Sequence, residues 1–179
     1  MRQIIYRRNL LIAAIVAIAL SACSSPANKA AMTPQGVVVA KHHPYTVKVQ
    51  TSGGSETGAM DSSNISDVDL KEAIEAAIIE SKVFKDVIQG TNGDYDLSVR
   101  MTSLSKPVFG ATFTVEMETA WSVTKVSDKS VVMRQSVKST GVATMGEAFV
   151  AVTRLRMAVE NAAKENIRNG LKEIAELNL

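Results

Sequence analysis

Residues 112–125 read TFTVEMETAWSVTK, and they predict the fold more firmly than any other stretch of the chain. Apolar or β-branched side chains alternate with polar or small ones, which is the period of a strand with one buried face. A short polar turn follows at residues 127–129, and residues 130–144 resume the alternation. The pattern therefore predicts a long β-hairpin, residues 112–126 against residues 130–144. The alternating set of its first strand is Phe113, Val115, Met117, Thr119, Trp121 and Val123.

Shorter alternating stretches on the N-terminal side of the hairpin, at residues 45–50 and 95–101, predict two further strands. Between them, Ser66 and Asp69 have the spacing of a capping box, in which a serine oxygen and an acid satisfy free N–H groups of the first helical turn. Apolar residues recur after Ser66 with helical spacing, so we expect a helix from Ser66 to about Phe84.

The last predicted element is an amphipathic helix that follows Gly146 and reaches about Leu177. The full order is strand–helix–strand–strand–strand–helix. A helix with one apolar stripe covers the apolar face of a sheet. We therefore expect one α+β domain over residues 37–179, with a mostly antiparallel four-stranded sheet and two helices on one of its faces.

The N-terminus has the organisation of an export signal. Arg2, Arg7 and Arg8 form a positive segment, and residues 10–20 form an apolar run. This run is too short to span the hydrocarbon core of a membrane, which takes about 20 residues. Small residues follow it, so residues 1–22 are interpreted as a cleaved signal peptide. The alternative is an uncleaved anchor helix.

Cys23 follows this signal directly and is the only cysteine of the chain. A lone cysteine forms no intramolecular disulfide, and an exported protein gains little from a free thiol. The sequence Leu20-Ser21-Ala22-Cys23 resembles the lipobox of bacterial lipoproteins. The resemblance implies that the Cys23 thiol carries a diacylglycerol, that the chain is cut before Cys23 and that the new amine is acylated. Two or more acyl chains anchor a protein stably to a membrane that it does not span.

The residues after Cys23 bear on the choice of membrane and on the reach of the domain. In the enteric sorting pattern that this sequence resembles, aspartate at the position of Ser24 retains a lipoprotein at the inner membrane. Serine there implies transfer to the outer membrane, facing the periplasm. Residues 23–36 are mostly small or polar, with two prolines, and predict a flexible tether. Such a coil would hold the domain about 20 Å from the lipid on average.

The chain without its signal is close to neutral. The signal contains three arginines and no acidic residue, so 17 basic and 18 acidic side chains remain of the 20 and 18 in the full chain. This balance argues against nucleic acid as a partner, since nucleic-acid-binding domains carry a basic surface. Aromatic residues make up only 4% of the chain, which also argues against a carbohydrate-binding face of aromatic rings.

No catalytic or metal-binding set emerges from the sequence. The motifs of a nucleophile elbow and of phosphate-binding loops are absent. His42 and His43 are adjacent, so in an extended chain they point to opposite faces and do not converge on one metal. Glu116 and Glu118 form a possible carboxylate pair, but solvated positions explain them equally well. We predict no enzyme activity, no cofactor and no metal.

Two segments place apolar or cationic side chains where a partner could reach them. Residues 107–109 lie in a predicted break between strands, where they either fold back on the core or contact a partner. Near the start of the last helix, one aromatic and two arginine side chains either pack on a partner or on anionic lipid head groups, or take core and solvated positions. The predicted partner contact consists of Pro107, Val108, Phe109, Phe149, Arg154 and Arg156.

The order of elements over residues 45–177 resembles small envelope lipoproteins, including auxiliary lipoproteins of envelope transport systems, and the TolB N-terminal type of α/β domain. The resemblance is carried by the strand that begins Tyr95-Asp96-Leu97, the long hairpin and the final helix. It implies a non-catalytic accessory or scaffold subunit of a periplasmic complex for transport, assembly or secretion, with an envelope protein as partner. The alternative is a stand-alone periplasmic binder of a lipid or other small ligand, with its pocket between helices and sheet.

Overall fold

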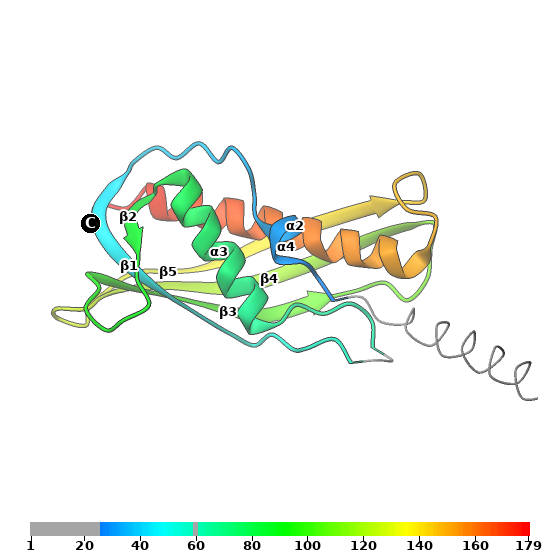
Figure 1. Cartoon of the computed structure of the whole chain (residues 1–179), viewed down its shortest axis with the longest axis horizontal. Coiled ribbons are helices and arrows are strands. Elements are labelled where there is room, and N and C mark those ends of the chain that lie inside the picture. The colour runs from blue at the N-terminus through cyan, green and yellow to red at the C-terminus, as the bar shows by residue number, and fades with distance from the viewer. Residues whose placement is uncertain (1–25, 59–60) are drawn as a thin grey trace, which may run out of the picture.

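The computed structural model describes residues 26–58 and 61–179 (Figure 1). The predicted signal peptide and Cys23 lie outside the described residues. Within the described ranges, no helix has both the length and the apolar character needed to cross a membrane. The elements are α2 (Lys29–Met32), β1 (His43–Ser52), α3 (Asp67–Ser81), β2 (Phe84–Val87), β3 (Tyr95–Ser105), β4 (Thr112–Lys125), β5 (Val131–Thr144) and α4 (Ala151–Ala175).

The five strands form one mixed sheet in the order β2-β1-β3-β4-β5. β3, β4 and β5 are antiparallel neighbours, whereas β1 pairs in parallel with both β2 and β3. The α+β class is confirmed, but the predicted four-stranded, mostly antiparallel sheet was wrong in strand number and in the direction of one half. The missed strand β2 has only four residues, which are too few to show alternation. Alternation also reveals which face of a strand is buried and says nothing about the direction of its neighbour.

The predicted hairpin is present, with 14 residues in each of β4 and β5. Its register pairs Thr112 with Thr144 at one end and Val123 with Met133 near the other. All six members of the predicted alternating set are buried, and Trp121 is fully buried. The hairpin prediction is therefore confirmed in both position and facing.

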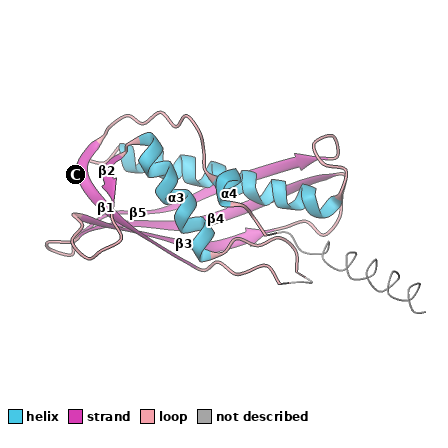
Figure 2. Cartoon of the chain, viewed as in Figure 1, coloured by secondary structure: helices cyan, strands magenta, loops and turns pink. Residues whose placement is uncertain are grey.

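α3 and α4 both cover the same face of the sheet (Figure 2). α3 begins as predicted, because the Ser66 hydroxyl oxygen accepts a hydrogen bond from Asp69 N–H at 3.1 Å. The same hydroxyl donates to the Asp69 carboxylate at 2.6 Å. The helix ends at Ser81, earlier than predicted, because Lys82 takes a left-handed conformation with φ of 56°.

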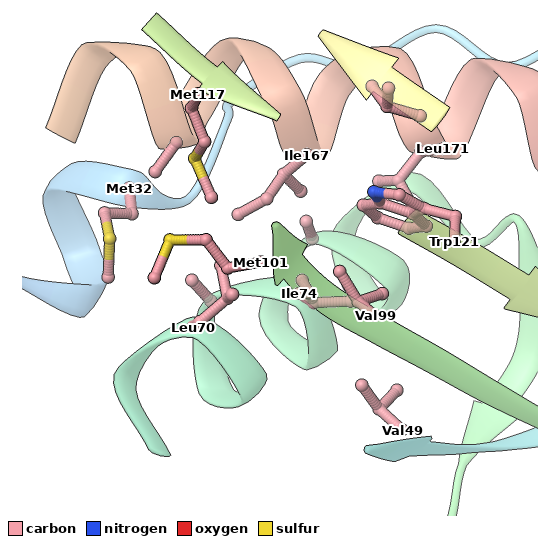
Figure 3. Packing of buried hydrophobic residues seen from close by; sticks show 14 of the residues in the cluster. Met32, Val49, Leu70, Ile74, Val99, Met101, Met117, Trp121, Ile167 and Leu171 are labelled. Carbon is pink, nitrogen blue, oxygen red and sulfur yellow. The ribbon is translucent and has the colours of Figure 1, made fainter. Parts of the chain in front are cut away.

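The core between sheet and helices contains one buried polar cluster. The Trp121 indole N–H donates to the Thr119 hydroxyl oxygen at 2.7 Å, and that hydroxyl donates to Asn166 Oδ1 at 2.6 Å. Asn166 in turn donates through Nδ2 to the Val137 carbonyl at 2.9 Å, so α4 is hydrogen-bonded to both strands of the hairpin. Figure 3 shows Trp121 together with apolar side chains of the core, among them Ile74, Val99, Ile167 and Leu171.

Two glycines let α4 lie close to the hairpin. A Cβ added at Gly141 of β5 would overlap backbone atoms of Ala158 and Ala162 in α4. From the helix side, a Cβ added at Gly170 would overlap the indole ring of Trp121. The close approach of α4 to the sheet therefore requires glycine, which has no side chain, at both positions.

Residues 26–36 form a docked segment, which corrects the flexible-tether prediction over this range. Ala27 is 4% exposed and Met32 is fully buried. The segment contacts both α3 and α4, and Asn28 N–H donates to Glu160 Oε1 at 2.9 Å. Small and polar composition favours a coil in an isolated segment, but it does not reveal that a groove elsewhere in the fold accepts two apolar side chains.

Candidate functional site at the apolar end of the sheet

Two loops meet at one end of the sheet, at the right of Figure 1. Residues 106–111 join β3 to β4, and residues 145–150 join β5 to α4. The loops meet because the hairpin register places Thr112, where β4 begins, opposite Thr144, where β5 ends. We call these two loops together the apolar end.

The apolar end exposes several large hydrophobic side chains. Val108 is 92% exposed and Phe109 is 87% exposed in the first loop, and Phe149 is 84% exposed in the second. Met145 and Val150 are also exposed. Val150 is the N-cap of α4, a position that usually carries a polar side chain to satisfy a free N–H, and here no side chain does so. Several large exposed apolar side chains on adjacent loops are typical of a site that contacts a protein or a membrane.

Arg154, in the first turn of α4, ties the two loops together. Its Nη1 donates to the carbonyl oxygens of Ala148 and Phe149 at 2.7 and 3.0 Å, and its Nη2 donates to the Gly110 carbonyl at 3.0 Å. The guanidinium carbon lies 4.8 Å from the centre of the Phe113 ring, within cation–π range. Arg154 is itself 3% exposed, so it fixes the shape of the apolar end from inside.

The docked N-terminal segment enters the fold beside the same loops. Lys106, the first residue of the first loop, donates through Nζ to the Ser63 carbonyl at 3.0 Å and to Asn64 Oδ1 at 2.5 Å. The Asn64 carbonyl accepts a hydrogen bond from Ala27 N–H at 3.2 Å. Desolvation of the Lys106 amine lowers its pKa, as expected for a cation that is held against the protein. The first described residue, Pro26, therefore lies next to the base of the apolar end.

The structure places four of the six predicted contact residues together. The alternative in which residues 107–109 and Phe149 fold back on the core does not hold, because three of these side chains are the most exposed large hydrophobics of the described ranges apart from Val38. Pro107 is half-buried at the base of the first loop. The four residues that come together are Pro107, Val108, Phe109 and Phe149.

The two predicted contact arginines do not join this surface. Arg154 is buried and acts on the loops, as described above. Arg156 is partly exposed on the side of α4 that faces the docked segment, where its Nε lies 3.6 Å from Glu160 Oε1. The helical spacing of α4 did not reveal the role of Arg154, because that role depends on carbonyl oxygens of two loops that lie far apart in the sequence.

The histidines have separate structural partners. His42 Nδ1 lies 2.9 Å from the Lys82 carbonyl, and His43 Nε2 lies 3.0 Å from the Ile174 carbonyl. Each ring is thus hydrogen-bonded to a backbone carbonyl near the end of a different helix. In residues 26–58 and 61–179, no three His, Cys, Asp or Glu side chains gather in a way that could hold a metal ion.

The described surface has shallow depressions, one of which lies between the end of α3 and strands β1 and β2. One of about 580 Å³ is lined by Glu116 and Glu118, which lie on the outer face of β4. Glu118 there accepts a hydrogen bond from the Ser136 hydroxyl at 2.6 Å. A second, of about 600 Å³, is lined partly by His42. The space between helices and sheet, where a ligand pocket was the alternative expectation, is filled by core side chains.

Comparison with known proteins places the fold. No family model and no curated protein matches this chain. Protein XCC0632 from Xanthomonas campestris, of family DUF330, aligns with a TM-score of 0.58 at 12% identity, over 79% of this chain and 88% of that chain. PelC from Paraburkholderia phytofirmans, a dodecamer, aligns with a TM-score of 0.51 at 15% identity, over 76% of this chain and 91% of that chain.

A minor lipoprotein from Acinetobacter baumannii is also similar, over 76% of this chain and 96% of that chain. Its TM-score is 0.44 at 7% identity, which does not establish a shared fold. The chain therefore shares its α+β fold with XCC0632 and PelC, and at these identities the likeness establishes the fold alone.

Proposed function

We propose that this protein is a non-catalytic lipoprotein, anchored through Cys23 at the periplasmic face of the outer membrane. We propose further that it acts as an accessory or scaffold subunit of an envelope complex. The observation that carries the proposal is the docked segment 26–36 together with the lipobox-like residues 20–23. Only residues 24 and 25 separate Cys23 from the docked segment. A lipid on Cys23 would hold the folded domain directly against its membrane.

This short connection favours a subunit with a fixed position. Three residues from Cys23 to Pro26 span at most about 11 Å, so the domain has little freedom to move away from the anchor. A flexible tether would instead suit a domain that searches the periplasm for its ligand. A domain held close to the membrane in one orientation suits a structural part of a larger complex.

The buried polar groups of the described residues support a non-catalytic role. The His43 ring is hydrogen-bonded to the Ile174 carbonyl, and the Arg154 guanidinium donates hydrogen bonds to loop carbonyls. Thr119 and Asn166 bond each other inside the core. Such groups stabilise the fold, whereas catalysis needs a nucleophile and a base that converge on an accessible cavity.

The fold is compatible with membership of a large assembly. PelC, which shares this fold, is described as a dodecamer. The alternative of a stand-alone binder of lipid or another small ligand receives less support, because buried apolar side chains pack the described core between helices and sheet.

In-cell crosslinking of the full-length protein tests the proposal, with mass spectrometry of the captured proteins and of the protein's own N-terminus. Cys23→Ser is the control, since it removes the lipidation site and keeps the folded domain. We expect a diacylglyceryl mass on Cys23 and one dominant envelope partner, and we expect the control to lose both. A Cys23 without lipid, or a protein that crosslinks to nothing in either form, would contradict the proposal.

A further inference from the structure

We propose that the apolar end rests in the interfacial layer of the membrane that carries the Cys23 lipid, with Phe109 and Phe149 inserted among the head groups and upper acyl chains. The inference deepens the proposed function, on which it rests, because it takes Cys23 as the anchor. It assigns to this surface a lipid bilayer as its partner.

The first argument is the chemistry of the surface. Aromatic and aliphatic side chains at loop tips enter the head-group region of membranes, where their apolar parts leave water at little conformational cost. The apolar end offers two phenylalanines and three aliphatic or thioether side chains from two adjacent loops. The exposed side chains are Val108, Phe109, Met145, Phe149 and Val150.

The second argument is the treatment of charge within the two loops. Each loop contains one charged residue, and each charged side chain forms hydrogen bonds within the protein. Lys106 donates to Ser63 and Asn64 at the base of the first loop. The Glu147 carboxylate accepts hydrogen bonds from the Thr144 N–H and hydroxyl, both at 2.8 Å. The tip residues 107–111 and 148–150 themselves carry no charge, so the two charged side chains are held at the bases of the loops.

The third argument is the position of the anchor. Pro26 lies beside the base of the apolar end, through the contacts of Ala27 with Asn64 and of Asn64 with Lys106. Cys23 lies three residues before Pro26 and so within about 11 Å of it along the chain. The described residues therefore begin on the same side as the apolar loops, and acyl chains on Cys23 would be within reach of that side.

The fourth argument is that the surface is preformed. Arg154 holds both loops through three carbonyl oxygens. Gly110 adopts φ of 149°, a conformation that side chains disfavour, so the first loop takes its shape at a glycine. A rigid surface loses little entropy on binding, and a lipid anchor already supplies proximity.

Other exposed apolar residues lie elsewhere and provide a matched control. Val38 is 85% exposed, like Phe109, but it lies in the segment between α2 and β1. That segment runs over the top of the molecule and away from the apolar end in Figure 1. Membrane contact through the apolar end predicts that Val38 remains in water.

Tryptophan fluorescence tests the inference in the full-length protein, expressed in bacteria so that it is processed and purified from their membranes. Phe109→Trp, Phe149→Trp and the control Val38→Trp are reconstituted into phosphatidylethanolamine–phosphatidylglycerol vesicles, with or without acyl chains brominated near the head group. The native Trp121 is fully buried and provides a constant background. We expect a blue shift and quenching by brominated lipid for the two phenylalanine positions and neither for Val38→Trp.

The outcomes separate this inference from the proposed function. Intact-mass measurement of the same samples reports whether Cys23 carries lipid. Lipid on Cys23 with unquenched tryptophan at residues 109 and 149 overturns the inference and leaves the lipoprotein proposal standing. No lipid on Cys23 overturns both. Equal quenching at residue 38 would also overturn it, since the domain would then contact lipid without a preferred face.

Discussion

The two ends of the antiparallel half of the sheet are closed by segments of opposite chemistry. At one end, residues 126–130 form the turn between β4 and β5, and residues 88–94 lead into β3. We call these two segments the polar end. A backbone hydrogen bond joins them, since Val126 N–H donates to the Asp94 carbonyl at 2.9 Å. Asp128 accepts hydrogen bonds from the N–H and hydroxyl of Ser130 at 2.9 and 2.6 Å.

The apolar end has similar internal hydrogen bonding but different tips. Glu147 caps Thr144 there much as Asp128 caps Ser130 at the polar end. The tips, however, expose Phe109 and Phe149. The turn segments of the polar end, residues 88–94 and 126–130, contain none of the exposed large hydrophobic side chains, although Val131 beside them is 48% exposed. The comparison therefore separates residues that hold the fold from residues that are available for contact.

The largest effect is expected from Gly141→Val. The added side chain would meet the backbone of Ala158 and Ala162, which cannot move aside without displacing α4 and, with it, Arg154. We expect a loss of more than about 4 kcal/mol in the free energy of unfolding, measured by urea denaturation. Gly146→Ala is the control, because its Cβ would meet only the Thr144 hydroxyl at 3.7 Å. A stability change of similar size in both variants would mean that α4 does not depend on close approach at Gly141.

Two phenylalanines four residues apart sharpen the comparison. Phe113 is 4% exposed beneath the apolar end, and Phe109 is 87% exposed at its tip. Phe113→Ala should cost about 3 kcal/mol through lost burial and an unfilled cavity. Phe109→Ala should change stability by less than about 0.5 kcal/mol. Equal losses in thermal denaturation would show that Phe109 belongs to the core.

Arg154→Met should loosen the apolar end and leave the polar end unchanged. Methionine keeps much of the apolar length of the side chain but donates no hydrogen bonds to Ala148, Phe149 and Gly110. We expect a loss of about 1–3 kcal/mol in the free energy of unfolding, since three partly buried carbonyl groups lose a charged donor. Amide hydrogen exchange should rise in residues 106–111 and 145–150. Faster exchange throughout the sheet would indicate a global role and contradict a local one.

Glu160→Gln tests the hydrogen bond between Glu160 and Asn28 of the docked segment. Burial raises the pKa of the Glu160 carboxyl above its ordinary 4.5, against the opposing effects of the Asn28 N–H and of nearby cations. The folded state thus prefers the protonated form, so this contribution to stability is complete below pH 4.5 and is lost as pH rises through the raised pKa. Glutamine keeps an acceptor for Asn28 and removes the titration.

We therefore expect Glu160→Gln to change stability at pH 7 by less than about 1 kcal/mol. It should also flatten the decline of stability with rising pH above 4.5, measured by chemical denaturation at several pH values. Glu165→Gln, on an exposed side of the same helix, is the matched control. A pH profile that both substitutions leave unchanged would show that Glu160 does not titrate in this way.

The smallest effect compares the two carboxylate caps. Hydrogen bonds from Thr144 lower the pKa of Glu147, and hydrogen bonds from Ser130 lower the pKa of Asp128. Each group stabilises the fold above its ordinary pKa, and this contribution is lost as pH falls through the lowered value. NMR titration should therefore find both carboxyls still ionised below 4.5 and 3.8 respectively. A Glu147 pKa at or above 4.5 would mean that the cap at the apolar end is open in solution.

Much of the antiparallel half was predictable because its interactions are local in sequence. The β4–β5 hairpin repeats one two-residue pattern around a short turn, and the start of α3 is fixed by Ser66 and Asp69, three residues apart. Phe109 and Phe149 could also be picked out as candidate contact residues, since they are large apolar residues in expected loop or helix-start positions. Whether they pointed inward or outward could not be decided from spacing.

The other half was not predictable in the same way. The short strand β2 and the docked segment 26–36 are stable only because a distant surface receives them. β2 pairs with β1 across the length of α3, and Met32 packs between α3 and α4. The inward turn of Arg154 likewise depends on carbonyl oxygens from two loops that the hairpin register brings together.

By itself, the sequence determined the hairpin, the two long helices, the α+β class and the resemblance of residues 20–23 to a lipobox. Each of these is carried by periodicity or by a short motif, so neighbouring residues contain the information. Only the tertiary structure decided the parallel half of the sheet, the docking of residues 26–36 and the gathering of the exposed apolar side chains at one end. Those features depend on contacts between residues far apart in the chain, and the free energy that orders them comes from burial against surfaces that exist only once the rest has folded.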